Sequence, residues 1–333
     1  MSSINRIGVL GAGAWGTTLA IVAERAGREV VLWARRPQQA AALAAQRENA
    51  LHLPGIKIDR AIAVTGDIQA ALKADAILVA LPAQHLREHV APLAWPRAVP
   101  AVICAKGIER GSLCSMPEVM AAIQAAAPLA MLSGPTFASE VARGKPGAIV
   151  IAANEVALAE DLAAAIATPQ FRPYASDDLV GVALGGAVKN VLAIGCGIVL
   201  GRGLGENARA ALVTRGLAEL ARLVDAAGGK RETAMGLSGA GDLILTATSA
   251  QSRNTSLGEA LGRGRALADI LAERSSVAEG VESGAAVVAL ARRHGAEMPI
   301  CESVAAILAG GSIDDELRRL LARPLKRESE TGA

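Results

Sequence analysis

Aromatic residues are scarce in this sequence: tryptophan, tyrosine and phenylalanine together make up 2% of its 333 residues. An excess of one charge is missing too, because 34 lysines and arginines nearly balance 32 aspartates and glutamates. Proteins that bind nucleic acid usually combine a basic patch with aromatic side chains on which bases stack. The composition therefore argues against a nucleic-acid partner.

Cysteines at metal-binding or redox spacing are also absent. The four cysteines show no C-x-x-C pattern, which is typical of reduced, mostly buried thiols in a cytosolic protein (Cys104, Cys114, Cys196 and Cys301). The first residues run straight into a strand pattern and lack the regions of a signal peptide. We therefore expect a cytoplasmic protein without a metal centre.

One apolar run, Leu179–Gly201, is long enough to cross a bilayer, yet Lys189 and Asn190 lie in its middle. A central lysine would cost about 3 kcal/mol on insertion. Five glycines within Val180–Leu200 weaken the segment as an isolated helix, and no aromatic belt flanks it. We expect a buried helix of a protein that is not integral to the membrane, and a membrane span is the alternative.

The first half of the chain alternates β-branched runs with alanine-rich runs. A helix is expected at Thr17–Ala26 and another near Asp67. The alternation of strand-like and helix-like runs predicts an α/β fold with a Rossmann-type doubly wound parallel sheet. The strands are expected at Arg6–Leu10, Glu29–Trp33, Ala61–Thr65, Ala76–Leu81, Ala101–Ala105, Ala130–Ser133, Ala148–Ala152 and Phe171–Tyr174.

The second half has helical patterns and few β-like runs. We expect a dinucleotide-binding domain at 1–178 and an all-α substrate and catalytic domain at 179–333. The helices are expected at Leu184–Leu200, Ala208–Ala227, Asn254–Leu261, Ala266–Arg274, Val281–His294, Ser303–Ala309 and Ile313–Ala322.

A G-x-G-x-x-G motif lies between the first strand and the first helix. Gly11 allows a tight turn, Gly13 lets the backbone approach a pyrophosphate, and Gly16 packs the helix on the strand. The helix N-terminus adds N–H donors and a positive dipole. In this context the motif predicts a dinucleotide site.

The end of the second strand lacks the carboxylate that usually binds the ribose of NAD. Arg35 and Arg36 stand there instead. Guanidinium groups suit the 2′-phosphate of NADP, so we expect NADPH to be preferred and NAD to be possible. The alternative is a solvated surface pair.

Polar groups follow two later strands. Lys106 follows AVICA, and ligands bind at the carboxyl ends of parallel strands. In SGPTFASE, Gly134 and Pro135 suit the N-cap and first position of a short helix, and the Thr136 hydroxyl could bind a polar ligand. The alternatives are a solvated loop lysine and ordinary helix capping.

Lys189 lies within the apolar run. Burial disfavours the charged form of lysine and lowers its pKa, so that it can exchange a proton near neutral pH. The alternative is that the side chain extends to the surface.

The segment Gly239–Asn254 holds a second polar set. Asp242 and Thr246 would share a helix face, and Ser252, Arg253 and Asn254 precede the next helix. Free N–H groups and a guanidinium make a phosphate site, with ordinary capping as the alternative.

Together these segments resemble the bacterial NAD(P)-dependent glycerol-3-phosphate dehydrogenases. The motifs that match are GAGAWGTTLA, KGIE, LSGPTFASE, LGGAVKNVLAIG, NARAALVTRGLAE, GLSGAGDLILT, QSRN and VAEGV, in order from residue 11 to 281. The sequence departs from the family at Ala14, where serine is frequent, and around Val277.

The resemblance implies Lys189 as the proton acceptor for the substrate hydroxyl. It also implies a set of substrate contacts, comprising Lys106, Gly134, Thr136, Lys189, Asp242, Ser252, Arg253 and Asn254. The implied cofactor contacts, with the glycines of the motif, are Gly11, Gly13, Ala14, Trp15, Gly16, Arg35, Arg36, Lys106, Ala138, Arg253, Val277 and Glu279.

The implied reaction interconverts dihydroxyacetone phosphate and sn-glycerol 3-phosphate and supplies glycerophospholipid synthesis. Lys189 would exchange the proton, Asp242 would orient or electrostatically tune Lys189, and Lys106 would polarise the carbonyl oxygen. Two alternatives are a related two-domain reductase of keto or hydroxy acids and a non-catalytic NADPH sensor. The expected partner is a small-molecule substrate, and a homodimer is possible.

Overall fold

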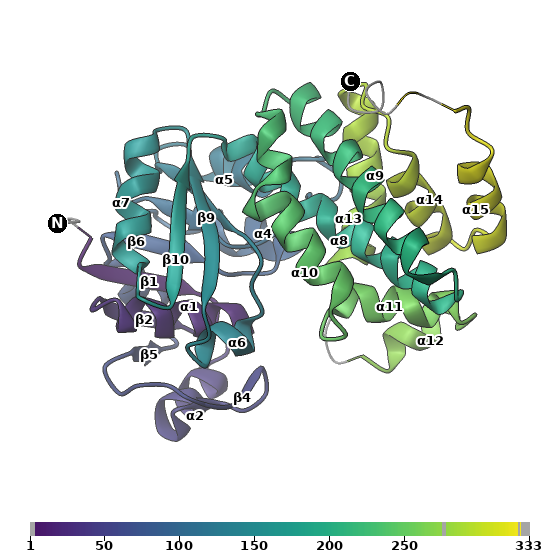
Figure 1. The fold of residues 1–333 in the computed structure, drawn as a ribbon. Helices are drawn as coiled ribbons and strands as arrows, with labels where there is room; N and C mark the ends of the chain where they lie inside the picture. The colour runs from purple at the N-terminus through teal and green to yellow at the C-terminus, as the bar shows by residue number, and fades with distance from the viewer. Residues whose placement is uncertain (1–3, 275–277, 326, 328–333) are drawn as a thin grey trace. The chain divides into compact units, whose positions relative to one another are not determined.

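The computed structural model describes residues 4–274, 278–325 and 327. Their contacts divide into two compact units, which we describe separately (Figure 1). Unit 1 comprises the residues up to Ala105 together with Met116–Leu179, and unit 2 comprises Lys106–Ser115 together with the residues from Val180 onward. The sequence-based expectation placed all of residues 1–178 in one domain. Lys106–Ser115 instead has its contacts in unit 2, since Ile108 is buried in that unit's core.

Unit 1 contains a sheet of eight strands in the described part of the chain, in the order β10-β9-β8-β7-β6-β1-β2-β5. The expected strands are confirmed, with ends that differ by a residue or two. They are β1 (Arg6–Leu10), β2 (Glu29–Trp33), β5 (Ala63–Thr65), β6 (Ala76–Val79), β7 (Ala101–Ile103), β8 (Leu129–Ser133), β9 (Gly147–Ala153) and β10 (Phe171–Ser176). A separate hairpin pairs β3 (Glu48–Asn49) with β4 (Leu53–Lys57).

The sheet is parallel, as expected, except at one pair of strands. β8 and β9 run antiparallel, while the other neighbours in the sheet run parallel. The link between β8 and β9 holds only the five-residue helix α6 (Ala138–Ala142). A parallel partner needs a crossover connection that returns along the whole sheet, which this short link does not provide.

Helices cover both faces of the sheet. Ile7 and Val9 of β1 join the core cluster that includes residues of α1 and α7, whereas Gly8 faces α3. This alternation is the two-residue period of a strand buried on both sides. The helices of unit 1 are α1 (Ala14–Arg25), α2 (Pro37–Gln46), α3 (Ile68–Leu72), α4 (Leu86–Val90) preceded by the 3-10 turn η1 (Ala83–His85), α5 (Met116–Ile123), α6 and α7 (Val156–Ile166).

Unit 2 is helical, as the sequence predicts (Figure 1). Its core includes apolar side chains of α8, α9, α10, α11, α13 and α14. The elements are α8 (Leu179–Gly201), α9 (Gly205–Ala226), the 3-10 turn η2 (Arg231–Met235), the π-helical turn η3 (Leu237–Gly241), α10 (Asp242–Thr248), α11 (Arg253–Gly262), α12 (Leu267–Ala272), α13 (Glu279–Arg293), α14 (Pro299–Leu308) and α15 (Ile313–Leu321).

Helix α8 is long and apolar enough to cross a membrane, but its most apolar stretch is wholly buried within the protein. Val188, Val191, Leu192 and Ile194 all have no exposed surface. A core helix passes the same length and composition test as a membrane span. The burial therefore supports the core-helix interpretation of this segment.

All four cysteines are free thiols, as expected. Burial raises the pKa of the Cys196 thiol to about 12, and burial beside Glu219 holds the pKa of Cys301 well above its usual value. Because the thiolate is the nucleophilic form, these two residues act as small apolar side chains.

Helix α14 begins at a buried carboxylate from another helix. Glu219 of α9 is 2% exposed, and its two oxygens accept hydrogen bonds from the backbone N–H groups of Ile300 (2.7 Å) and Cys301 (3.2 Å). These are among the N–H groups that a helix start leaves without partners. Burial nevertheless dominates and raises the pKa of Glu219 to about 7.

The raised pKa makes stability depend on pH in a defined direction. Glu219 ionises near 4.5 when unfolded and near 7 when folded, so its contribution is fully present below pH 4.5 and is lost as the pH rises to about 7. The loss amounts to about 3 kcal/mol. Glu219→Gln keeps an acceptor oxygen but cannot ionise, so its thermal unfolding midpoint should lack this decline. Equal pH dependence in both proteins would contradict the assignment.

Candidate functional site

The glycine motif of unit 1 joins β1 to α1. Gly11 has a φ of +111°, and a Cβ at Gly16 would lie 1.8 Å from the carbonyl oxygen of Gly11, so both positions need glycine. Gly13 is the N-cap of α1, and a Cβ there would meet nothing within 4 Å. Ala14 and Trp15 form the first turn of the helix, which begins three residues earlier than expected. The open space at Gly13 fits the approach of a pyrophosphate.

Two side chains that the motif does not reveal hold this loop. The carbonyl oxygen of Ala12 accepts hydrogen bonds from Nε2 of Gln39 and Nδ2 of Asn49, both at 3.0 Å. The Asn49 amide also donates to the hydroxyl of Thr17 at 2.8 Å. No local pattern marks either residue, because each acts across a long separation in sequence.

Arg35 and Arg36 are exposed just beyond the carboxyl end of β2. Arg36 is the N-cap of α2 and, with Gln39 and Asn49, helps line a pocket of about 400 Å³. Arg35 contacts His89. Burial and the charge of Arg36 lower the pKa of His52. Two exposed guanidinium groups on the β2 side of the glycine loop fit a phosphorylated ribose.

The prediction that Gly134 and Pro135 begin a short helix is wrong. Gly134 has a φ of +139°, and a Cβ on it would lie 2.9 Å from the Cα of Ile149. The chain bends there, and α6 begins only at Ala138, with Phe137 as its N-cap. Thr136 lies in the extended link, where its hydroxyl donates to the carbonyl oxygen of Gly134 at 3.4 Å.

Ala138 is tied to the glycine-motif helix within unit 1. The Thr18 hydroxyl donates to the carbonyl oxygens of Ala14 (2.9 Å) and Ala138 (3.1 Å). The start of α6 therefore lies against the first turns of α1. This position is consistent with the cofactor contact that the resemblance implies for Ala138.

Unit 2 contains a cluster of two lysines and one carboxylate. Lys106 Nζ lies 2.5 Å from Oδ2 of Asp242, and Lys189 Nζ lies 3.1 Å from its Oδ1. Lys189 also donates to the Thr246 hydroxyl at 3.0 Å. The three charged side chains are only 3–14% exposed. Neither of the alternatives weighed for the lysines, a solvated loop position for Lys106 or a surface position for Lys189, agrees with these contacts.

The backbone explains how Lys189 reaches Asp242. A Cβ at Gly185, one turn before Lys189, would lie 2.9 Å from the carbonyl oxygen of Ser238 in η3. The absence of that carbon lets α8 approach the π-helical turn that leads into Asp242. The expectation that Asp242 and Thr246 share a helix face is confirmed, since their oxygens lie 3.4 Å apart on α10.

The electrostatics of this cluster favour proton exchange by Lys189. Burial lowers the pKa of its ammonium, the nearby charge of Lys106 acts in the same direction, and the carboxylates of Asp242 and Glu279 oppose them without outweighing them. Burial also opposes ionisation of Asp242, but the two ammonium groups outweigh it and hold its pKa below the usual value. Asp242 is therefore an anion between two lysines.

A chain of side-chain amides adjoins Lys189. Asn190 donates to Oε2 of Glu279 at 3.1 Å and accepts from Nδ2 of Asn254 at 2.9 Å. The Asn254 carbonyl oxygen accepts from the backbone N–H of Gly280 at 3.1 Å. These bonds join α8, α11 and α13, so the side chain of Asn254 serves to connect helices. These bonds use one of the two N–H donors of its amide, so the second N–H and the backbone N–H remain as candidate ligand contacts.

A helix begins here as expected, but at Arg253, so that Arg253 and Asn254 lie in its first turn. The Ser252 hydroxyl is the N-cap of α11 and accepts from the N–H of Thr255 at 3.1 Å. Arg253 is exposed in the first turn. Arg274, which the motif reading missed, donates to the Arg253 carbonyl oxygen at 2.7 Å and adds a second positive charge. Val277 lies outside the described residues.

The geometry thus separates into a nucleotide-type set in unit 1 and a lysine–aspartate set in unit 2. A family model described as NAD-dependent glycerol-3-phosphate dehydrogenase N-terminus matches residues 6–159, and its C-terminal counterpart matches residues 178–317.

The chain belongs to the NAD(P)-dependent glycerol-3-phosphate dehydrogenase family. A glycerol-3-phosphate dehydrogenase (NAD(P)+) of Rhodospirillum rubrum is 56% identical over 330 residues, which are 98% of this chain and 94% of that protein. The corresponding protein of Caulobacter vibrioides is 53% identical over 98% of this chain and its own full length. The members of this family are oxidoreductases that use NAD or NADP.

Solved structures agree with this family assignment. The crystal structure of glycerol-3-phosphate dehydrogenase from Coxiella burnetii has a TM-score of 0.90 and 38% identity, and the match covers 96% of this chain and 99% of that one. A ketopantoate reductase from Ralstonia eutropha has a TM-score of 0.58 at 18% identity, covering 94% of this chain and 99% of that one, so the likeness is one of fold alone. The family assignment therefore favours the dehydrogenase over the keto-acid reductase weighed earlier.

Proposed function

We propose that this chain interconverts dihydroxyacetone phosphate and sn-glycerol 3-phosphate with NADPH as its preferred cofactor, and thereby supplies glycerophospholipid synthesis in the cytoplasm. The observation that carries the proposal is the buried Lys106–Asp242–Lys189 cluster, in a chain whose relatives are glycerol-3-phosphate dehydrogenases. A nucleotide-binding sensor would have no need of two lysines on one buried carboxylate.

The cofactor would be held by unit 1, through Gly11, Gly13, Gly16 and the start of α1, with Ala14, Trp15 and Ala138 beside it. The nicotinamide supplies hydride exchange at the carbon that carries the substrate oxygen. Arg35 and Arg36 would bind the 2′-phosphate. Lys106, Arg253, Val277 and Glu279 remain proposed cofactor contacts on the basis of the family motif.

Lys189 would exchange the proton of the substrate oxygen. An ammonium has three N–H bonds, and the bonds to Asp242 and Thr246 use two of them, so the third can donate to the substrate. In reduction the ammonium gives this proton to the developing alkoxide, and in oxidation the neutral amine takes it back. Asp242 orients both lysines, and the charge of Lys106 stabilises negative charge on the carbonyl oxygen.

The substrate phosphate would bind where α11 begins. The Arg253 guanidinium and the backbone N–H of Asn254 supply donors there, and the helix dipole adds to the attraction. Ser252 fixes this turn through its cap, while Gly134 and Thr136 remain proposed substrate contacts. Binding the phosphate positions the reacting carbon and so accelerates the reaction.

The direct test compares substrates. Dihydroxyacetone phosphate should be reduced, with loss of NADPH absorbance, far more efficiently than unphosphorylated 2-keto acids. The same assay with NADH should give a lower kcat/KM. A preference for keto acids would overturn the proposed substrate, and a preference for NADH would overturn the proposed cofactor selectivity.

Replacing Arg253 should weaken substrate binding more than it slows the chemical step. A hydrogen bond to a charged group contributes about 1.5–3 kcal/mol, so Arg253→Ala should raise KM for dihydroxyacetone phosphate about 10- to 100-fold. Steady-state kinetics would measure the change. Arg263→Ala, which removes an exposed arginine just past the C-terminal end of the same helix, is the matched control and should leave KM unchanged. An unchanged KM in Arg253→Ala would exclude its role in phosphate binding.

We also propose a homodimer formed through unit 2. Large apolar side chains are exposed there at Met235 (64%), Ile244 (50%) and Leu204 (40%). Exposed apolar groups of this size are often covered by a partner. Light scattering during gel filtration should give twice the mass of the chain, and a monomer at micromolar concentration would contradict the proposal.

A further inference from the structure

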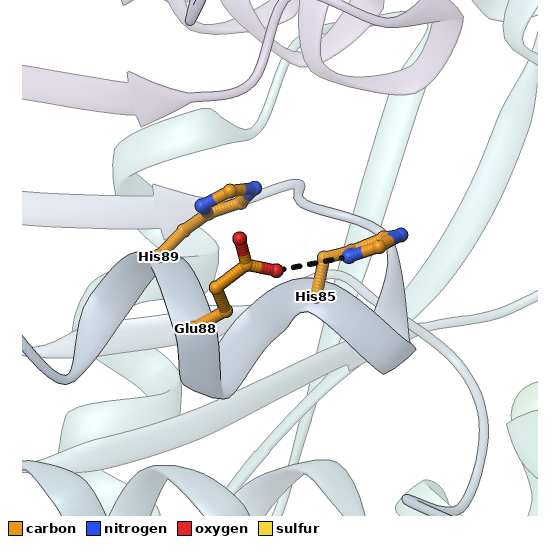
Figure 2. A group of neighbouring side chains, drawn as sticks. All are labelled: His85, Glu88 and His89. Atoms are coloured by element: carbon orange, nitrogen blue, oxygen red, sulfur yellow. Dashed lines mark hydrogen bonds and ion pairs between the residues drawn. The ribbon is translucent and has the colours of Figure 1, made fainter.

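A group of three neighbouring side chains lies in the part of unit 1 that follows β6. His85, Glu88 and His89 project from η1 and α4 toward one another (Figure 2). Nδ1 of His85 lies 3.3 Å from Oε2 of Glu88, and the two imidazole rings stack with centroids 6.0 Å apart and an angle of 22°. None of the family motifs that we identified includes these residues.

His89 is in direct contact with Arg35, one of the two residues proposed to bind the 2′-phosphate. Nη1 of Arg35 lies 2.9 Å from Nε2 of His89. A guanidinium can only donate, so Nε2 accepts and carries no proton in this arrangement. The contact joins residues that are 54 positions apart in the sequence.

The sheet explains why these residues meet. β1 lies between β6 and β2, and all three strands are parallel. The glycine motif follows the carboxyl end of β1, Arg35 follows β2, and His89 follows β6. Ligands bind at this edge of such a sheet. Arg35 and His89 therefore lie on opposite sides of β1, at the edge of the sheet where the glycine motif lies. Arg35 follows β2, and His89 belongs to α4, the helix after β6.

We propose that His89 is a positioning residue for cofactor selectivity, which holds the Arg35 guanidinium in place for the 2′-phosphate of NADPH. The proposal rests on the assignment of Arg35 in the proposed function. An exposed arginine samples many rotamers, and fixing one of them before binding lowers the entropy lost on binding. The stack on His85, itself paired with Glu88, restricts the His89 ring in turn.

A metal ion is the other occupant that this cluster could suggest, because three potential ligand atoms lie within 4.8 Å of one another. The Arg35 guanidinium argues against it. It occupies Nε2 of His89 and places a positive charge beside the cluster, which repels a cation and attracts an anion. The observations therefore favour a role in positioning Arg35 over a metal site.

The test measures kcat and KM for NADPH and NADH in a set of variants. His89→Ala should raise KM for NADPH about three- to tenfold, with kcat and KM for NADH nearly unchanged. His89→Gln should restore most of the selectivity, because its amide oxygen can accept from Arg35. The double variant Arg35→Ala/His89→Ala should be no less selective than Arg35→Ala, since His89 acts through Arg35. His294→Ala, an exposed histidine of unit 2, is the control.

The outcomes separate the two proposals. If Arg35→Ala leaves the ratio of kcat/KM for NADPH to that for NADH unchanged, the 2′-phosphate assignment itself fails. If Arg35→Ala lowers the ratio and His89→Ala does not, the positioning role of His89 is overturned. A ratio that changes on addition of Zn²⁺ and is restored by EDTA would assign the cluster to a metal ion instead, and would also overturn the proposal.

Discussion

Lys189→Ala is expected to lower kcat about 10²- to 10⁴-fold for both reduction and oxidation, which is the usual contribution of a positioned proton donor. NADPH binding should persist, because the proposed pyrophosphate and 2′-phosphate contacts lie in unit 1. Steady-state turnover measures the first effect, and the fluorescence of bound NADPH measures the second.

Two further variants separate proton exchange from charge. Lys189→Arg keeps a positive charge but cannot release its proton near neutral pH, so it should also be inactive. Lys230→Ala removes an exposed lysine of the same unit and should turn over like the wild type. Near-normal turnover in Lys189→Ala would exclude this residue as the proton donor.

Asp242→Asn is expected to have the second large effect. The amide has nearly the shape of the carboxylate but cannot offset two buried ammonium groups. Breaking a buried ion pair on one side typically costs about 3–5 kcal/mol of stability. We expect kcat to fall about 10²-fold or more, since Lys189 loses the group that orients it. Thermal unfolding and turnover measure the two effects.

The pH profile gives the sign of the electrostatic role of Asp242. Reduction needs the ammonium form of Lys189, so its rate declines as the pH rises through the pKa of that group. The Asp242 carboxylate raises this pKa against the effect of burial. In Asp242→Asn the decline should therefore move to lower pH. Asp225→Asn, which removes an exposed carboxylate of unit 2, should leave the profile unchanged, and an unmoved profile in Asp242→Asn would reject the role.

Local sequence patterns were enough for most elements of the fold. Continuous apolar runs predicted the strands of the sheet, and helical periodicity predicted the helices of unit 2, because both patterns record which faces are buried. The antiparallel direction of β9 could not be predicted in this way. An apolar strand has the same composition in either direction, and the direction depends on the length of the link that precedes it.

The candidate site shows the same division. Neighbouring residues alone were enough for two of its parts. The G-x-G-x-x-G spacing predicted a nucleotide site, and a lysine within an apolar helix predicted a buried cation. The resemblance suggested Asp242 as a partner of Lys189, but two other pairings were not visible. Lys106 pairs with Asp242 across 136 positions, and the start of α14 depends on a carboxylate of α9.

The sequence by itself determined the class of fold, the position of the nucleotide motif and the family, because these depend on spacing over a few residues and on motifs in a fixed order. Only the tertiary structure decided that Asp242 is shared by two lysines, that the Asn254 side chain connects helices, and that Arg35 contacts His89. Such contacts join distant segments, and the packing of helices and strands selects them.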